Sequence, residues 1–296
     1  MTSASSWNIN VTTPAQSQRH GLVYPFSSPT SPTMTLQILS DLHLESPKAY
    51  DIFEIVPRAP YLALLGDIGN TSHKDDFLGF LTRQLKQFRA VLLVPGNHEP
   101  FHSSWTESLG ILRAFEQDIR KDPSLGEFVL LDRAAFRLPD TNITILGCSL
   151  FSDVPPESEM AVSFGLNDFF QIRDWDVGAH NEAHKRDLAW LNAQVADLKQ
   201  CDDIIIFSHW SPSRDARAVD PRHANSPITS AFSTVLSGEE CFRSDKVKLW
   251  AFGHTHYNCD FIVERDEASP LRLLANQRGY YFAQAEGYDG EKTVYL

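Results

Sequence analysis

Residues 91–99 are Val-Leu-Leu-Val-Pro-Gly-Asn-His-Glu, an apolar run that leads directly into a polar motif. The run Val91–Val94 predicts a buried strand, because continuous aliphatic residues leave no polar face for solvent. The motif Gly96-Asn97-His98-Glu99 then lies where this strand ends. In open α/β sheets, ligands bind at the carboxyl ends of the strands. The sequence therefore predicts an α/β fold with functional residues at one edge of a sheet.

Four further apolar runs are followed by polar motifs in the same way. The runs are Met34–Leu39, Tyr61–Leu65, Ile204–Phe207 and Val247–Phe252. The motifs are Asp41-Leu42-His43, Gly66-Asp67-Ile68-Gly69-Asn70, Ser208-His209-Trp210 and Gly253-His254-Thr255-His256. Two carboxylates, four imidazoles and the Asn97 amide oxygen would then gather at neighbouring strand ends. Oxygen and imidazole ligands without thiolate suit Mn, Fe or Zn, and this number of ligands suits two metal ions that share a bridge.

The spacing within two of the motifs supports this interpretation. Asp41 and His43 stand two residues apart, and His254 and His256 repeat the spacing. Side chains two residues apart in an extended segment point to the same side. We therefore expect each pair to face the site from an extended strand exit. A carboxylate has two oxygens and can bridge two cations, which makes Asp67 the candidate bridge.

The five motifs, in this order, resemble the pattern of the calcineurin-like metallophosphoesterase superfamily. The resemblance covers residues from about 34 to at least 256. It implies a four-layer αββα sandwich, with two mixed β-sheets packed face to face between outer helices, and hydrolysis of a phosphoester by a metal-activated hydroxide. It also implies one metal ion held by Asp41, His43 and His256, and a second held by Asn97, His209 and His254, with Asp67 as the bridge.

By the same resemblance, His98 contacts the substrate rather than a metal ion. We expect it to protonate the leaving oxygen or to stabilise transition-state charge. Protein phosphatases of the superfamily have an Asp three residues after the bridging carboxylate to orient this histidine, whereas this chain has Asn70. Asn70 can accept a hydrogen bond but carries no negative charge to hold the imidazolium, so we expect His98 to be less acid-like here than in that branch.

The motifs leave the kind of phosphoester open. They lack the signatures of the protein-phosphatase branch and the Tyr of purple acid phosphatases, so both diesters and monoesters of small molecules remain candidates. The polar loop 211–225 follows His209 and is a candidate substrate-binding segment, because guanidinium groups pair well with phosphate. Its candidate residues are Arg214, Arg217, Arg222 and His223. Alternatively, these arginines pair with Asp215 and Asp220 in a solvated loop.

Composition narrows the class of protein. The 296 residues are 42% hydrophobic and carry a formal net charge of −12. This charge argues against general nucleic-acid binding, which needs a basic face. No run approaches the roughly 18 apolar residues of a membrane span, and no basic segment precedes an apolar one as in a secretion signal. We expect a cytoplasmic phosphoesterase with a small substrate and no membrane association; protein partners are not indicated. A catalytically weak metal-binding scaffold and a nuclease on the same fold are the alternatives.

The remaining segments predict the domain organisation. Residues 1–33 are rich in Ser, Thr and Pro without Asp or Glu, so we expect a disordered extension, compatible with organellar targeting, before one domain over residues 34–296. Periodicity predicts helices over 101–121 and 180–199, and residues 151–177 predict a loop or cap near the cleft. Strands of the second sheet are predicted at 128–131, 136–138, 143–146, 261–264, 271–275 and 280–283.

Overall fold

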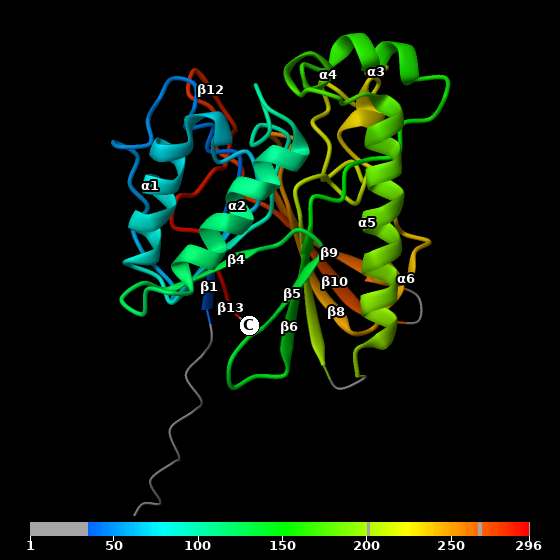
Figure 1. The fold of residues 1–296 in the computed structure, drawn as a ribbon. Helices are drawn as coiled ribbons and strands as arrows, with labels where there is room; N and C mark the ends of the chain where they lie inside the picture. Colours follow the sequence, from blue (N-terminus) through cyan, green and yellow to red (C-terminus); the bar gives the residue numbers. More distant parts are fainter. Residues whose placement is uncertain (1–34, 200–201, 266–267, 296) are drawn as a thin grey trace, which may run out of the picture. The chain divides into compact units, whose positions relative to one another are not determined.

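Two mixed β-sheets pack face to face, and helices cover the outer face of each sheet (Figure 1). The structure is a computed structural model that describes residues 35–199, 202–265 and 268–295. The predicted αββα sandwich is confirmed. The predicted disorder of residues 1–33 lies outside the described residues.

The first sheet carries the first three motifs. Its strands, in spatial order, are β13 (Thr293–Tyr295), β1 (Thr35–Leu39), β2 (Tyr61–Leu64), β3 (Ala90–Leu93) and β4 (Glu127–Leu130). Strands β1 to β4 are parallel, and β13 is antiparallel to β1. The placement of residues 128–131 in the second sheet was wrong, because Phe128 pairs with Val91 of β3. Periodicity identifies a strand but not its neighbour, and the helix before β4 returns the chain to the first sheet.

The second sheet carries the other two motifs. Its strands, in spatial order, are β5 (Ala134–Arg137), β6 (Ile143–Cys148), β7 (Asp203–Ser208), β8 (Val247–Phe252), β10 (Ala268–Ala275) and β9 (Cys259–Arg265). Strands β6, β7, β8 and β10 are parallel, and the two edge strands are antiparallel. The predicted strand 280–283 was wrong. It is a separate hairpin of β11 (Gly279–Tyr280) and β12 (Ala283–Gln284), because the chain turns back between them.

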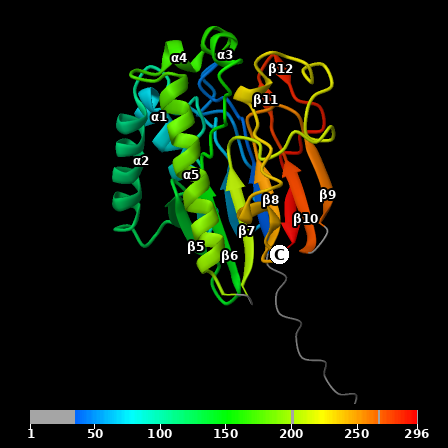
Figure 2. The ribbon, with the colours of Figure 1, turned by 90° about the vertical axis from the view of Figure 1, so that its right-hand side faces the viewer.

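Helices pack against the outer faces of both sheets (Figures 1 and 2). Helices α1 (Lys74–Leu85) and α2 (Trp105–Ile119) cover the first sheet, and α5 (Val177–Asp197) and α6 (Glu240–Arg243) cover the second. The predicted cap segment forms the short helices α3 (Glu159–Gly165) and α4 (Asp168–Gln171). Two 3-10 turns, η1 (Thr71–His73) and η2 (Thr229–Ala231), complete the described helical elements.

Alternation along the strands builds three apolar layers. In β1, Leu36 and Ile38 pack between the sheets, whereas Leu39 packs against the helices of the first sheet. Successive side chains of a strand point to opposite faces, so fully apolar strands fill both sides of each sheet. This packing fixes the strand ends, and with them the backbone that carries the motifs.

The two sheets are joined at the edge where the motifs lie. Ser40, just after β1, donates its N–H to Asn276 O, and its own carbonyl accepts from Arg278 N–H, each at 3.0 Å. These bonds connect the carboxyl end of β1 to the segment after β10. In the described part of the chain, no helix is long and apolar enough to cross a membrane.

Candidate metal centre

The site backbone turns sharply after three of the five motif-bearing strands, β1, β2 and β8. Five site residues have positive φ angles, between 47° and 69°: Asp41, His43, Asp67, His254 and His256. The expected extended exit after β1 and β8 was therefore wrong. The Asp41 N–H donates to Gly66 O and the His43 N–H donates to Asp67 O, which bends one strand exit around the next. Left-handed conformations of non-glycine residues cost about 1–3 kcal/mol each and concentrate at functional sites.

Asp41, His43 and His256 form the first group of potential ligands. His256 Nε2 lies 3.0 Å from His43 Nε2 and 3.3 Å from Asp41 Oδ1. Asp41 is fully buried, and Ser40 Oγ and the His254 N–H donate to its oxygens. The structure thus brings together the three residues expected at the first metal ion.

Asn97, His209 and His254 form the second group, next to Asp67. His209 Nδ1 lies 2.7 Å from Leu65 O and donates to that carbonyl, so its Nε2 is left free for a ligand role. This Nε2 lies 3.0 Å from Asn97 Oδ1 and 3.4 Å from Asp67 Oδ1. His254 Nε2 is buried without a hydrogen-bond partner. An orphaned imidazole nitrogen beside a carboxylate fits a metal ligand, because burying a polar atom without a partner is costly.

Asp67 lies between the two groups. Its Oδ1 faces His209, and its Oδ2 lies 4.0 Å from His43 Nε2. The two carboxylate oxygens therefore face different groups, an arrangement in which Asp67 can bridge two ions. Two glycines allow this approach: a Cβ at Gly96 would lie 2.3 Å from Asp67 Oδ1, and one at Gly253 would lie 2.7 Å from Asp41 Oδ2.

His98 is held by Glu45 rather than by Asn70. Glu45 Oε1 lies 2.8 Å from His98 Nδ1 and 3.2 Å from His43 Nδ1. The Asn70 side chain instead accepts from Ser72 N–H and caps η1. Burial alone would lower the pKa of His98, but the charges of Asp67 and Glu45 outweigh it and raise that pKa to about 9. The expectation that His98 lacks a negative charge to hold its imidazolium overlooked Glu45, which stands two residues after His43.

Glu99 joins the second and third motifs. This fully buried carboxylate accepts from the N–H groups of Asp67, Ile68 and Gly96, at 2.7–3.0 Å. Burial and the neighbouring charge of Asp67 raise the pKa of Glu99 to about 7, and the backbone donors oppose that shift. Glu99 follows His98 in the sequence motif, but only the fold reveals that it fixes both loops.

Asp168, at the start of α4, holds the amide of Asn97. Its Oδ1 accepts from Asn97 Nδ2 at 2.9 Å, which turns Asn97 Oδ1 toward His209. Burial raises the pKa of Asp168 to about 6, and its Oδ2 is buried without a partner. No sequence pattern predicts this role, because Asp168 lies in a segment of poor periodicity far from every motif.

The arginines of loop 211–225 are mostly tied to other groups. Arg214 donates to Ser233 O, and Arg217 pairs with Asp215. Arg222 pairs with Asp220, as the solvated-loop alternative anticipated, and both residues line a cavity that His223 also lines. His223 alone of the four candidates lines the cavity that contains His98.

The comparison with known proteins follows the same motifs. A sequence model of calcineurin-like phosphoesterases matches residues 34–258, about three quarters of the chain. The chain belongs to the calcineurin-like phosphoesterase family. This phosphoesterase is therefore a metal-dependent hydrolase of phosphoester bonds, and its His and Asp clusters provide groups that could bind divalent metal ions.

One relative in sequence and one solved structure are similar to the phosphoesterase over most of its length. An uncharacterised protein of Acanthamoeba polyphaga mimivirus is 26% identical over 267 residues, which cover 83% of this chain and 91% of that protein. The crystal structure of the phosphopantetheinyl hydrolase of Mycobacterium tuberculosis matches with a TM-score of 0.61 at 16% identity. That match covers 84% of this chain and 90% of the hydrolase chain. At 16% identity, the likeness to the hydrolase shows a shared fold alone.

Proposed function

We propose that this phosphoesterase holds two divalent metal ions and hydrolyses small phosphodiesters. Asp41, His43 and His256 would hold one ion, and Asn97, His209 and His254 the other, with Asp67 shared between them. Mn, Fe and Zn all accept this set of oxygen and imidazole ligands. Two bound ions would supply an activated water as nucleophile and positive charge for the phosphoryl oxygens.

The residues of the chain would orient the substrate and move the proton. His98 Nε2 lies 3.9 Å from Asp67 Oδ2, so a phosphoryl group at the metal centre would lie beside this imidazole. Its other nitrogen contacts Glu45, which favours the charged ring. These two contacts support the proposal that His98 gives a proton to the leaving oxygen.

The observation that carries the preference for diesters is that two cavities meet at the proposed metal centre. The small cavity has a volume of about 360 Å³ and includes Asp67 and His98 in its lining. The large cavity has a volume of about 1150 Å³. His256 and Tyr280 line both. A phosphodiester has two ester substituents, which we call its arms, and each cavity offers room for one arm.

The charges of the small cavity also favour a diester. Among the described residues that line it, none is Lys or Arg, and protonated His98 would supply one positive charge. A monoester carries up to two negative charges, which cationic side chains commonly bind, whereas a diester carries one. The acidic residues Asp168 and Asp220 in the lining would further disfavour a dianion beside the metal centre.

The test is turnover of two chromogenic esters by protein that has been stripped of metal and refilled with Mn, Fe, Zn or Mg in turn. We expect bis(p-nitrophenyl) phosphate to be hydrolysed faster than p-nitrophenyl phosphate, and only with metal present. Asp67→Asn should abolish both activities. A clear preference for the monoester would contradict the diester proposal, whereas metal-independent turnover would contradict the mechanism.

A further inference from the structure

We infer that the enzyme breaks one particular bond of an unsymmetrical diester: the P–O bond to an uncharged apolar arm, which leaves from the small cavity, while a polar arm stays on phosphorus in the large cavity. This inference rests on the proposed diester hydrolysis and specifies which of the two P–O ester bonds breaks. Three features of the two cavities carry it.

The first feature is the difference in lining. Aromatic and aliphatic side chains form part of the small cavity's lining, beside polar residues such as Asp168 and Asp220. They are Phe101, Leu166, Val219, Ile228 and Phe232. Phe101 stacks on His98 with ring centroids 4.2 Å apart, and Phe232 stacks on His254 at 4.9 Å. The apolar wall therefore begins directly at the site histidines. Such a surface binds a ring or an aliphatic group and disfavours a charged one.

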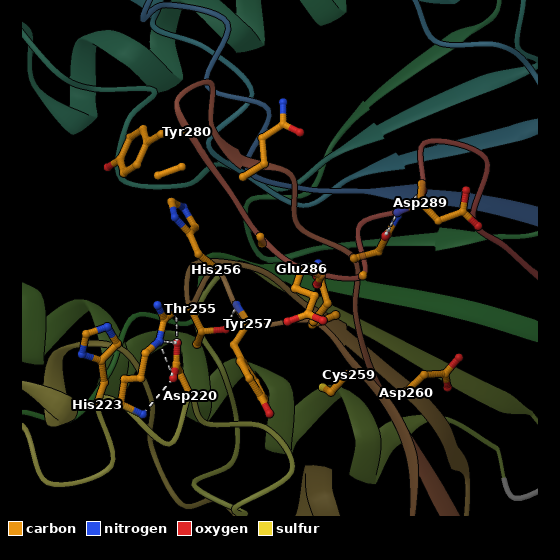
Figure 3. Close-up of a pocket in the computed structure, with 18 of the residues that line it drawn as sticks. Asp220, His223, Thr255, His256, Tyr257, Cys259, Asp260, Tyr280, Glu286 and Asp289 are labelled. Carbon is orange, nitrogen blue, oxygen red and sulfur yellow. Dashed lines mark hydrogen bonds and ion pairs between the residues drawn. The ribbon is translucent and has the colours of Figure 1, made fainter.

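The large cavity has the opposite character. Away from the metal centre it is lined by hydrogen-bonding and charged groups, among them Asn258, Asp260, Glu286, Asp289 and Lys292. Figure 3 shows His256 and Tyr280 at one end of this cavity, with Asp260 and Asp289 toward the other. A polar arm that extends from the metal centre would meet donors and acceptors along its length.

The second feature is the position of the proton donor. His98 and Asp67 line the small cavity, and neither belongs to the described lining of the large one. The leaving oxygen must face His98 to receive its proton. The arm attached to that oxygen therefore occupies the small cavity.

The third feature is the position of Tyr280, which lines both cavities. Its ring stacks on His43 with centroids 4.2 Å apart, and its hydroxyl lies 3.3 Å from His98 Nε2. Tyr280 lines both cavities, so the two arms would meet beside its side chain. Its hydroxyl, next to His98 Nε2, could hydrogen-bond to an oxygen of the phosphate group there.

In the proposed reaction, one P–O bond forms and the P–O bond to the apolar arm breaks. An oxygen from water bonds to phosphorus, and the P–O bond to the apolar arm breaks with its electron pair on the leaving oxygen. That oxygen takes a proton from His98 Nε2 and leaves as an uncharged alcohol, and the proton given up by the attacking water restores the charged imidazole through solvent. The polar arm remains on a phosphate monoester.

The test uses benzyl glyceryl phosphate, whose two alcohols are similar leaving groups, with the Mn-loaded full-length protein. Phosphorus NMR should reveal glycerol phosphate in at least tenfold excess over benzyl phosphate. Predominant benzyl phosphate, or equal amounts of both, would overturn the inference while leaving diester hydrolysis intact. No turnover of any diester, with monoester turnover present, would overturn the proposed function and the inference together.

Two matched variants test the small cavity itself. Ile228→Trp should fill it, lowering kcat/KM for the benzyl diester at least tenfold and weakening calorimetric binding of the non-hydrolysable benzyl phosphonate analogue by a similar factor. Val235→Trp is the control, because Val235 is 58% exposed and lines neither cavity. Equal effects of the two variants, or unchanged binding in Ile228→Trp, would contradict the assignment of the apolar arm.

Discussion

Glu45 Oε1 lies 2.8 Å from His98 Nδ1 and 3.2 Å from His43 Nδ1, so one carboxylate touches a proposed metal ligand and the proposed proton donor. Burial alone would raise the pKa of Glu45, but its bonds to the two histidines outweigh burial and lower that pKa to about 2. The carboxylate is therefore ionised at neutral pH. From a position two residues after the first motif, it supplies the negative charge that Asn70 does not supply from the second.

Replacing Glu45 with Gln should lower kcat by at least tenfold. The amide keeps a hydrogen-bonding oxygen but removes the charge that favours protonated His98, and general acid catalysis contributes roughly 10²–10⁴-fold. Steady-state kinetics on bis(p-nitrophenyl) phosphate would measure the loss. Glu54→Gln is the control, since Glu54 is exposed. An unchanged kcat in Glu45→Gln would remove Glu45 from the mechanism.

Asp168→Ala should weaken the binding of metal at the site that contains Asn97. Without the bond from Asn97 Nδ2, the amide can rotate away from His209, and loss of such supporting bonds costs about 10–100-fold in metal affinity. Asp168→Asn keeps an acceptor oxygen and should bind metal more tightly than the Ala variant. Calorimetric Mn titration of both variants, with exposed Asp153→Ala as the control, would measure this order. Equal affinities in all three would show that Asp168 does not position Asn97.

Gly96→Ala should disrupt the centre although it adds only one methyl group. That Cβ would lie 2.3 Å from Asp67 Oδ1 and 2.8 Å from His209 Cε1, so both proposed ligands would have to move. Gly110→Ala is the matched control, because no atom lies within 4 Å of its added Cβ. In α2 this change should stabilise the protein by about 0.5–1 kcal/mol. Metal content and urea unfolding distinguish the two variants; normal metal binding by Gly96→Ala would contradict the geometry.

His180 should make stability fall as the pH decreases. Burial and nearby His184 lower its pKa to about 3, and Ser152 N–H donates to its Nε2 at 3.0 Å. An unfolded histidine takes up a proton below about pH 6.5. The unfolded state thus binds more protons between about pH 6.5 and 3, and stability is lost as pH falls through this window, at up to about 1.4 kcal/mol per pH unit.

His180→Gln removes this titration, so its free energy of unfolding should depend less on pH than that of the wild type. Between pH 6 and pH 5, the wild type should lose about 1 kcal/mol more of its free energy of unfolding than the variant does. Urea unfolding at both pH values would measure it. Identical pH dependence of the two proteins would contradict the assignment of a buried, neutral His180.

Sequence patterns predicted the parts of the molecule that depend on local order. Each motif-bearing strand was located within a few residues, since a short aliphatic run followed by Pro and Gly, such as Val91–Val94, is typical of a strand buried on both faces. Sheet membership was not predictable for residues 128–131, because strand pairing depends on contacts that one segment does not encode. The hairpin at Tyr280 and strand β13 are too short for any periodicity to identify.

The candidate site divides in the same way. Asp67 and the residues grouped around it lie in compact motifs, and the fold brings them together as the motif order predicted. The supporting residues Asp168 and Tyr280 come from segments more than 20 residues from the nearest motif used to identify a ligand. Their roles depend on how the cap and the β11–β12 hairpin close over the strand ends, which only the tertiary structure reveals.

The most direct test of the central claim is the number of metal ions bound per chain. Protein dialysed against Mn would be analysed by inductively coupled plasma mass spectrometry as wild type, Asp67→Asn and His98→Ala. We predict two ions in the wild type and in His98→Ala, with turnover lost or sharply reduced in the latter, and fewer than two in Asp67→Asn. A single ion in the wild type, or loss of metal in His98→Ala, would contradict the two-metal assignment with His98 as a non-ligand.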